Sequence, residues 1–217
     1  MLQIIKTQAA FLVPCLVFLL LGAVLLLNIE KGDFIFFFNE RRSLAGDLFF
    51  AWGTKLGEFV PYILGVLLLI YRKRYAYAIA IPVLAITVSI VSYLSKSFFA
   101  HYRPYTVFKQ EGILDQIQFI EGISINKAAS SFPSGHTMSA FAIYCFLSLV
   151  FPKKKYLGLV FFVLALIVGL SRVYLVQHFF QDIYLGAILG IFLAFAVYLS
   201  TVQVETRFRR RAVKRSV

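Results

Sequence analysis

Ionisable residues gather in three segments of this chain, and each segment adjoins a long apolar run. The segments are 96–104 (KSFFAHYRP), 131–140 (SFPSGHTMSA) and 171–182 (SRVYLVQHFFQD). One unpaired charge in membrane hydrocarbon costs about 2.5–3.5 kcal/mol even on lenient insertion scales, so charges beside such runs are candidates for function. These segments are therefore the first place to look for chemistry.

The basic side chains of these segments predict an anion site. Lys96 and Arg103 are seven residues apart, which places them on one face if the helix of Lys96 continues to Arg103 and ends at Pro104. Arg172 adds a guanidinium fork that suits two phosphate oxygens. The alternative for Lys96 and Arg103 is that they snorkel to the membrane interface.

The tetrapeptide Pro-Ser-Gly-His at 133–136 has the features of a helix start. Ser134 is a good N-cap, and Gly135 has no side chain that shields its amide. The free N–H groups and the positive dipole end of such a helix bind phosphate-like anions. The alternative is an ordinary capped membrane helix with His136 at the interface.

His178 and Asp182 are four residues apart and are predicted to share one face of a helix that begins near Val176. A carboxylate that accepts the proton of one imidazole nitrogen leaves the other nitrogen as a directed lone pair, which a nucleophile requires. An interfacial His–Asp pair is the alternative. Together with the cations and His136, the pair meets the needs of phosphoryl transfer. The residue types do not form a metal cage, so we expect neither a metal nor another cofactor.

The elements that position these residues are predicted to be membrane helices. The 217-residue chain is 60% hydrophobic, has a mean hydropathy of +0.83 and is 15% charged. We predict an all-α fold, a six-helix transmembrane bundle in a single domain over residues 1–217, with the active site at the outer membrane–water rim. The apolar runs that approach the ~20 residues of a membrane span are 8–28, 57–71, 77–95, 136–151, 157–170 and 179–200.

The net charge of +12 follows the positive-inside pattern. Suppose that the amino terminus is cytoplasmic and that successive helices cross the membrane in alternating directions. The cytoplasmic side then carries the entire excess of positive charge, with Glu205 as its single acidic residue. Both termini are therefore predicted to be cytoplasmic, and the three polar segments lie outside. We expect the basic tail 203–217 to contact anionic lipids rather than nucleic acid. The basic residues of the cytoplasmic side are Lys6, Arg72, Lys73, Arg74, Lys153, Lys154, Lys155, Arg207, Arg209, Arg210, Arg211, Lys214 and Arg215.

At these positions the chain resembles the type-2 phosphatidic acid phosphatase superfamily. The signature of that family reads K-x6-RP, then PSGH, then SR-x5-H-x3-D, and every fixed position and internal spacing of it is present within 96–182. The resemblance implies an integral-membrane phosphatase with six helices. The matching residues are Lys96, Arg103, Pro104, Pro133, Ser134, Gly135, His136, Ser171, Arg172, His178 and Asp182.

The resemblance also implies a role for each residue. His178 attacks phosphorus and becomes a phosphohistidine, and Asp182 orients it. His136 protonates the leaving oxygen and later activates water. His101 stands at a position that the signature leaves free and is expected in the interface or a loop, while 105–130 is expected to cover the site. The phosphate oxygens are held by Lys96, Arg103, Ser134, the Gly135 amide and Arg172.

A site at the rim of a bilayer bundle suits phosphates whose tails stay in the membrane. Family members of this architecture act on undecaprenyl pyrophosphate, phosphatidylglycerophosphate, phosphatidic acid or lipid A phosphates, and the sequence does not choose among them. We predict a metal-independent lipid phosphate phosphatase of the cell envelope, in a bacterial inner (cytoplasmic) membrane, with its site periplasmic or extracellular. The alternatives are a soluble-sugar phosphatase with the same chemistry, a non-enzymatic lipid or anion transporter, and a vanadium-dependent haloperoxidase. The haloperoxidase members of the family are soluble, so the six apolar runs weigh against that alternative.

Overall fold

The computed structural model describes residues 7–127, 130–152 and 155–215, and every regular element in these ranges is a helix. The all-α prediction is therefore confirmed. The α-helices are α2 (Ala9–Asn28), α3 (Asp33–Glu40), α4 (Leu44–Gly53), α5 (Phe59–Tyr71), α6 (Tyr75–Phe99), α7 (Pro104–Gln110), α8 (Gly135–Val150), α9 (Lys155–Tyr174) and α10 (Phe180–Arg215). Two short 3-10 helices are η1 (Thr54–Gly57) and η2 (Leu114–Gln116).

Each of the six apolar runs coincides with a helix, but the helices differ in their ability to cross a membrane. α2, α6, α9 and α10 are long and apolar enough to cross alone. The segments 44–57 and 59–71 meet the criterion only together, and they are bent by 52° at the break between them. α8 has only 16 residues. The described residues thus contain four spans by length and composition, or five with the bent pair, and six spans stay a prediction.

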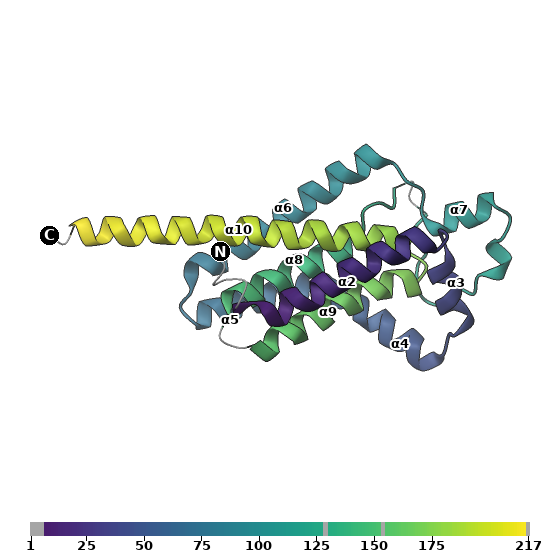
Figure 1. Cartoon of the computed structure of the whole chain (residues 1–217), viewed down its shortest axis with the longest axis horizontal. Coiled ribbons are helices and arrows are strands. Elements are labelled where there is room, and N and C mark those ends of the chain that lie inside the picture. Colours follow the sequence, from purple (N-terminus) through teal and green to yellow (C-terminus); the bar gives the residue numbers. More distant parts are fainter. Residues whose placement is uncertain (1–6, 128–129, 153–154, 216–217) are drawn as a thin grey trace.

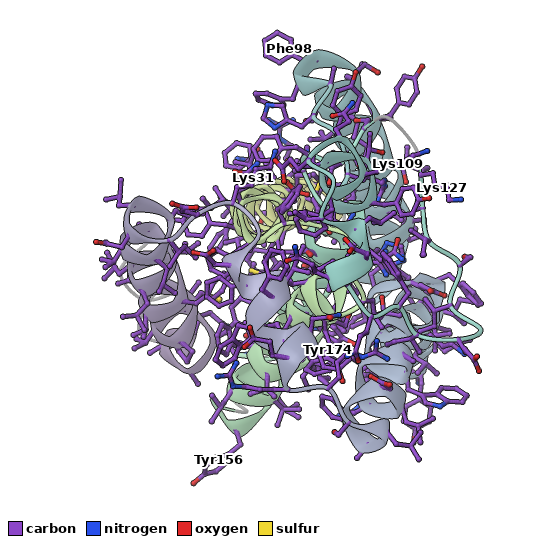
Figure 2. The ribbon with its side chains drawn as sticks, turned by 90° about the vertical axis from the view of Figure 1, so that its right-hand side faces the viewer. Lys31, Phe98, Lys109, Lys127, Tyr156 and Tyr174 are labelled. Carbon is purple, nitrogen blue, oxygen red and sulfur yellow. The ribbon has the colours of Figure 1, made fainter. Side chains whose placement is uncertain are left out.

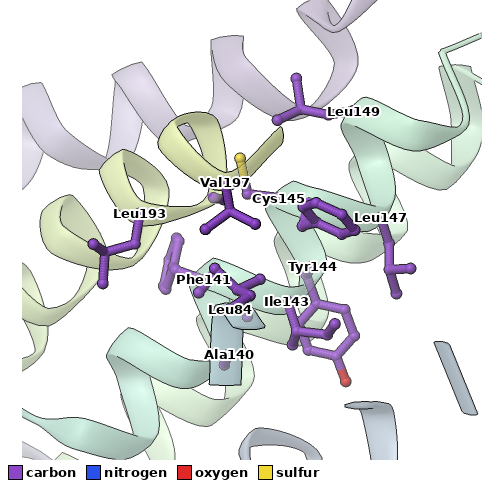
Figure 3. Packing of buried hydrophobic residues seen from close by; sticks show 14 of the residues in the cluster. Leu84, Ala140, Phe141, Ile143, Tyr144, Cys145, Leu147, Leu149, Leu193 and Val197 are labelled. Atoms are coloured by element: carbon purple, nitrogen blue, oxygen red, sulfur yellow. The ribbon is translucent and has the colours of Figure 1, made fainter. Parts of the chain in front are cut away.

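α8 lies at the centre of the bundle. Apart from Ser139, every residue from Thr137 to Val150 is buried. Figure 3 shows the apolar side chains of α8 packed against Leu84 of α6 and against Leu193 and Val197 of α10. A helix that is apolar on all sides is stable where other helices surround it. Because protein rather than lipid covers α8, a helix shorter than the bilayer suffices there.

Two glycines allow α10 to approach the start of α8 closely. A Cβ added at Gly186 would lie 2.8 Å from the carbonyl oxygen of Ser134. One added at Gly190 would overlap the carbonyl oxygen of Met138. Small residues four apart are a common means of close helix contact in membranes. The contact brings the first turns of α8 and α10, and hence the second and third polar segments, together.

The polar segments lie at one end of the bundle. In Figure 1, α2 begins and α10 ends at the left, whereas α3, α4 and α7 gather at the right. Figure 2 looks onto that right-hand end and shows Phe98, at the end of α6, pointing away from the bundle. The side of the membrane that each end faces stays a prediction. That prediction depends on basic residues, of which Lys6, Lys153 and Lys154 lie outside the described residues. The side chains of Lys155 and of residues 209–217 lie outside the description as well.

Residues 105–127 are fastened to α3 and α4 by polar contacts. Asn39 donates to the carbonyl oxygen of Gln118 at 2.8 Å and accepts from its amide at 2.9 Å. Arg42 donates to the same carbonyl at 2.6 Å and forms an ion pair with Asp47 at 2.8 Å. On the other side, the Gln177 side chain donates to the carbonyl oxygen of Ser124 at 3.2 Å. These contacts hold residues 105–127 at the end of the bundle where the three polar segments lie.

Candidate active site

His178 lies in the link between α9 and α10 and is only 2% exposed. Its Nδ1 is 3.0 Å from Oδ2 of Asp182. An ionised carboxylate can only accept a hydrogen bond, so Nδ1 carries the proton and Nε2 keeps its lone pair. Burial lowers the pKa of His178 to about 4, and the hydrogen bond to Asp182 offsets only part of this effect. The imidazole is therefore neutral near pH 7, the state in which Nε2 is nucleophilic.

The local structure around His178 differs from the predicted one. α10 begins at Phe180, and Val176 has a φ of +55°, which is unusual for a β-branched residue. The prediction of a helix start near Val176 is therefore wrong. His178 and Asp182 still meet, because Asp182 is the third residue of α10 and its Oδ2 turns back to accept from the Phe179 amide at 3.1 Å. This is the carboxylate half of a capping box.

The prediction for Lys96 and Arg103 is also wrong in its helix geometry. α6 ends at Phe99, and Ala100 follows in the left-handed conformation with a φ of +46°. Arg103 is the N-cap of a new helix, α7, and Pro104 is its first residue rather than the end of the preceding helix. Proline is favoured at that first position because its missing N–H has no partner there in any helix. Arg103 and Lys96 therefore reach the site from different elements.

Arg103 and Arg172 are nonetheless buried beside the nucleophile. Arg103 Nη1 lies 3.4 Å from Nε2 of His178 and donates to the carbonyl oxygen of Gln177 at 2.9 Å. Arg172 Nη1 donates to the hydroxyl of Thr54 at 2.8 Å. Within the part of the chain that the structure describes, Nε of each arginine has no hydrogen-bond partner. Both guanidinium groups are close enough to His178 for their charge to lower its pKa, and the same charge suits an oxyanion beside this histidine.

The 133–136 motif begins α8, and Ser134 is its N-cap. The Ser134 hydroxyl accepts from the amide and the hydroxyl of Thr137, at 3.4 and 3.0 Å. A Cβ added at Gly135 would lie 2.9 Å from the Ser92 hydroxyl and 3.7 Å from Nζ of Lys96. The absence of a side chain at this position thus lets the Ser92 hydroxyl of α6 approach the first turn of α8, with Lys96 beside it.

His136 lies next to an acid that the sequence did not single out. Its Nε2 is 3.8 Å from Oε1 of Glu58, the residue at the break between η1 and α5. The acid has a sequence signal only in that it stands at the start of the apolar run 57–71. Thr54, the partner of Arg172, and Ser131, a partner of Asp182, were missed as well. Neither has a distinctive spacing from the residue it contacts.

Two cavities meet at His136 and Glu58. A groove of about 600 Å³ runs along α5 and α6 and is lined by Tyr62, Ala85, Val88 and Lys96, among others. A second cavity of about 580 Å³ opens toward the 122–126 segment and is lined by Arg172 and Gln177. The walls of the first cavity are mainly apolar, whereas charged side chains, including Glu58 and Arg172, line the second. The arrangement provides room for an apolar chain on one side of His136 and for a polar group on the other.

The fold and the site define an all-helical membrane protein with a histidine–carboxylate pair beside buried cations, and such an arrangement is suited to phosphoryl groups. The model of the PAP2 superfamily matches residues 73–205, and the chain belongs to this superfamily. It is a multi-pass bacterial membrane protein and a lipid phosphatase of the PAP2 type.

Similar proteins include the lipid A 4'-phosphatase of Porphyromonas gingivalis, with 27% identity over 188 residues, which cover 84% of this chain and 77% of that protein. Phosphatidylglycerophosphatase B of Bacillus subtilis is 35% identical over 95 residues, which cover 40% of this chain and 46% of that protein. The crystal structure of Aquifex aeolicus LpxE has a TM-score of 0.63 and 25% identity, and the match covers 78% of this chain and 96% of that one.

Proposed function

We propose that the chain hydrolyses a phosphate monoester or pyrophosphate of a membrane lipid without a metal, through a phosphohistidine on His178. One observation carries the proposal. Nε2 of His178 is a buried, neutral nitrogen with Asp182 behind the ring at 3.0 Å and the Arg103 guanidinium in front at 3.4 Å. A neutral nucleophile next to a fixed positive charge suits attack on an anionic phosphate.

In the first step, the Nε2 lone pair of His178 forms a bond to phosphorus. The phosphorus–oxygen bond to the lipid breaks, and its electron pair leaves with the lipid oxygen. The lipid oxygen takes a proton from His136 and departs as the alcohol, or as the lipid monophosphate when the substrate is a pyrophosphate. Asp182 balances the positive charge that develops on the imidazole.

In the second step, water attacks the phosphohistidine. His136, now neutral, accepts a proton from the water as its oxygen bonds to phosphorus. The nitrogen–phosphorus bond breaks, its electrons return to Nε2, and inorganic phosphate leaves. Lys96, Arg103, Arg172, Ser134 and the Gly135 amide hold the phosphate oxygens in both steps.

The cavities support a substrate with an apolar tail. A tail in the groove along α5 and α6 would lie next to His136, and the second cavity has room for the rest of the headgroup. The names of the relatives point to lipid A phosphates and phosphatidylglycerophosphate. Undecaprenyl pyrophosphate and phosphatidic acid belong to the same chemical class.

The positive-inside pattern supports a site on the periplasmic or extracellular side of the bacterial inner membrane. Both termini are then cytoplasmic, and the basic tail 203–217 contacts anionic lipid. A reporter enzyme that is active only in the periplasm, fused at the carboxyl terminus, should be inactive. Activity of that reporter would overturn the orientation and leave the chemistry untouched.

Purified protein in detergent tests the chemistry. It should release phosphate from lipid phosphates in the presence of a chelator, and His178→Ala should lower kcat at least about 10³-fold, as loss of a nucleophile does. His101→Ala is the matched control, because this exposed histidine lies in the link before α7, and it should keep full activity. Full turnover by His178→Ala would refute the mechanism.

A substrate panel separates the alternatives. Lipid A, phosphatidylglycerophosphate, phosphatidic acid and undecaprenyl pyrophosphate are compared by kcat/KM with glucose 6-phosphate. A preference for the sugar phosphate would establish the soluble-sugar alternative. Binding of lipid phosphate without phosphate release would establish a transporter.

A further inference from the structure

Ser131 is a buried serine that the mechanism above does not use. It lies two residues before the 133–136 motif, outside the family signature, and its side chain is 0% exposed. Its hydroxyl makes a hydrogen bond to Oδ2 of Asp182 and lies 3.1 Å from Nδ1 of His178. The serine therefore touches both members of the nucleophilic pair.

The direction of these hydrogen bonds follows from the chemistry of the pair. Since Nδ1 of His178 carries a proton for Asp182, it cannot accept one from Ser131. The Ser131 hydroxyl must then donate to the carboxylate, and its own lone pair faces the Nδ1 proton. Oδ2 of Asp182 thus accepts from three donors, which are His178 Nδ1, the Phe179 amide and the Ser131 hydroxyl.

The other carboxylate oxygen of Asp182 is buried and has no hydrogen-bond partner among the described residues. The donors are thus concentrated on Oδ2, next to the imidazole, and Asp182 itself is 0% exposed. In such a site a lost donor is not replaced by bulk water, and its loss has a full effect.

The Ser131 backbone ties the pair to the segment that carries Arg103. The Ser131 amide donates to the carbonyl oxygen of His101 at 2.7 Å, two residues before Arg103. In addition, the Ser134 amide donates to the carbonyl oxygen of Asp182 at 3.0 Å. The loop that contains Ser131 is therefore held between the segment of Arg103 and the first turn of α10.

We propose that Ser131 is a positioning residue: its hydroxyl holds Oδ2 of Asp182 against Nδ1 of His178 and shares the carboxylate charge with the imidazole. The proposal rests on the proposed function of the site. Without the hydroxyl, the carboxylate is still held by the Phe179 amide and stays in contact with Nδ1, but it aligns the imidazole less tightly, which slows attack by Nε2. It also concentrates the remaining charge on the imidazole, which raises the pKa of His178.

Other charged or titratable groups face the pair, and the test leaves all of them in place. They are Arg172 on α9, Arg103 before α7, His136 on α8 and Lys96 on α6. A change in the pH profile of a Ser131 variant therefore reports the hydroxyl itself.

The experiment uses the full chain in detergent with ³²P-labelled phosphatidic acid in mixed micelles. A base quench preserves phosphohistidine, so the rate of label transfer to protein is measured apart from phosphate release. In Ser131→Ala the transfer rate should fall about 10- to 100-fold, the effect of one hydrogen bond to a charged group. The acid limb of kcat/KM should move up by about one pH unit.

The matched control is Ser148→Ala, which removes a buried hydroxyl at the other end of α8 that donates to Gln8 at 2.7 Å. It should change thermal stability only. Ser131→Cys, with a weak donor of similar size, should recover part of the transfer rate and serves as the test if Ser131→Ala does not fold. A folded Ser131 variant with the wild-type transfer rate and acid limb would overturn the proposal while the proposed function stands. If the wild-type protein releases no phosphate from any lipid of the substrate panel, both fall.

Discussion

The charge of Asp182 offers the sharpest test of how this site works. In Asp182→Asn, the Phe179 amide and the Ser131 hydroxyl still need an acceptor, so they keep the amide oxygen at the Oδ2 position. The Nδ1 proton of His178 then retains its acceptor, and the tautomer is preserved. The substitution therefore removes the negative charge with little change in geometry.

The size of the effect follows from the distance. A unit charge 3.0 Å from Nδ1 stabilises the imidazolium by about 5 kcal/mol at an effective dielectric constant of about 20. Replacing a charged hydrogen bond by a neutral one sets a lower bound of about 1.5 kcal/mol. We expect kcat to fall about 10²- to 10³-fold, between these limits. KM should stay nearly constant, because Asp182 contacts the nucleophile and not the phosphate.

The assay is steady-state phosphate release from phosphatidic acid micelles with chelator, at a temperature below the Tm of each variant. Asp33→Asn removes an exposed carboxylate at the same end of the molecule, where Asp33 accepts from the Glu30 amide, and should keep its activity. A folded Asp182→Asn protein with kcat within threefold of wild type would refute the electrostatic reasoning.

Three further predictions concern pH, the second acid and the helix contact. The neutral form of His178 attacks, and the pKa of this histidine is lowered to about 4. After correction for substrate ionisation, kcat/KM should therefore decrease only when the pH drops below about 4, not already below 6.5. A decrease that begins near pH 6.5 would contradict this prediction. Glu58 lies 3.8 Å from His136 and, in the proposed mechanism, stabilises the protonated form that donates to the leaving oxygen. Glu58→Gln should therefore slow hydrolysis of monoesters about 10-fold but hardly affect pyrophosphates, which have better leaving groups. Equal losses on both would argue against this role. Gly190→Ala would push α10 from α8 and cost about 1–3 kcal/mol of stability, seen as a lower Tm in detergent; an unchanged Tm would show that the contact adapts.

The sequence alone predicted the features that depend on local chemistry. Apolar runs this long predict membrane helices, because backbone groups in hydrocarbon must be paired and a helix pairs them within one segment. The start of α8 was evident from the serine and glycine at 134–135, because N-capping involves only neighbouring residues. The spacing of four residues brings His178 and Asp182 together whether His178 lies inside the helix, as predicted, or just before it, as observed.

The helix ends at the site were not predicted correctly, because long-range contacts determine where these helices begin and end. Ala100 and Val176 are in left-handed conformations that neither side chain favours, so sequence patterns extended both helices too far. α8 was predicted as one more span, and its full burial becomes evident only when α6, α9 and α10 surround it.

The sequence by itself determined that the chain is a membrane protein and which residue types, at which spacings, belong to its chemistry. Only the tertiary structure decided how they meet. Thr54 reaches Arg172 across 118 positions of the chain, and Ser131 reaches Asp182 across 51. Contacts at such separations leave no period in the sequence, because they are fixed by how the helices pack and not by the local backbone. The nucleophile, its carboxylate and the serine behind them form one unit only once α8 and α10 lie against each other.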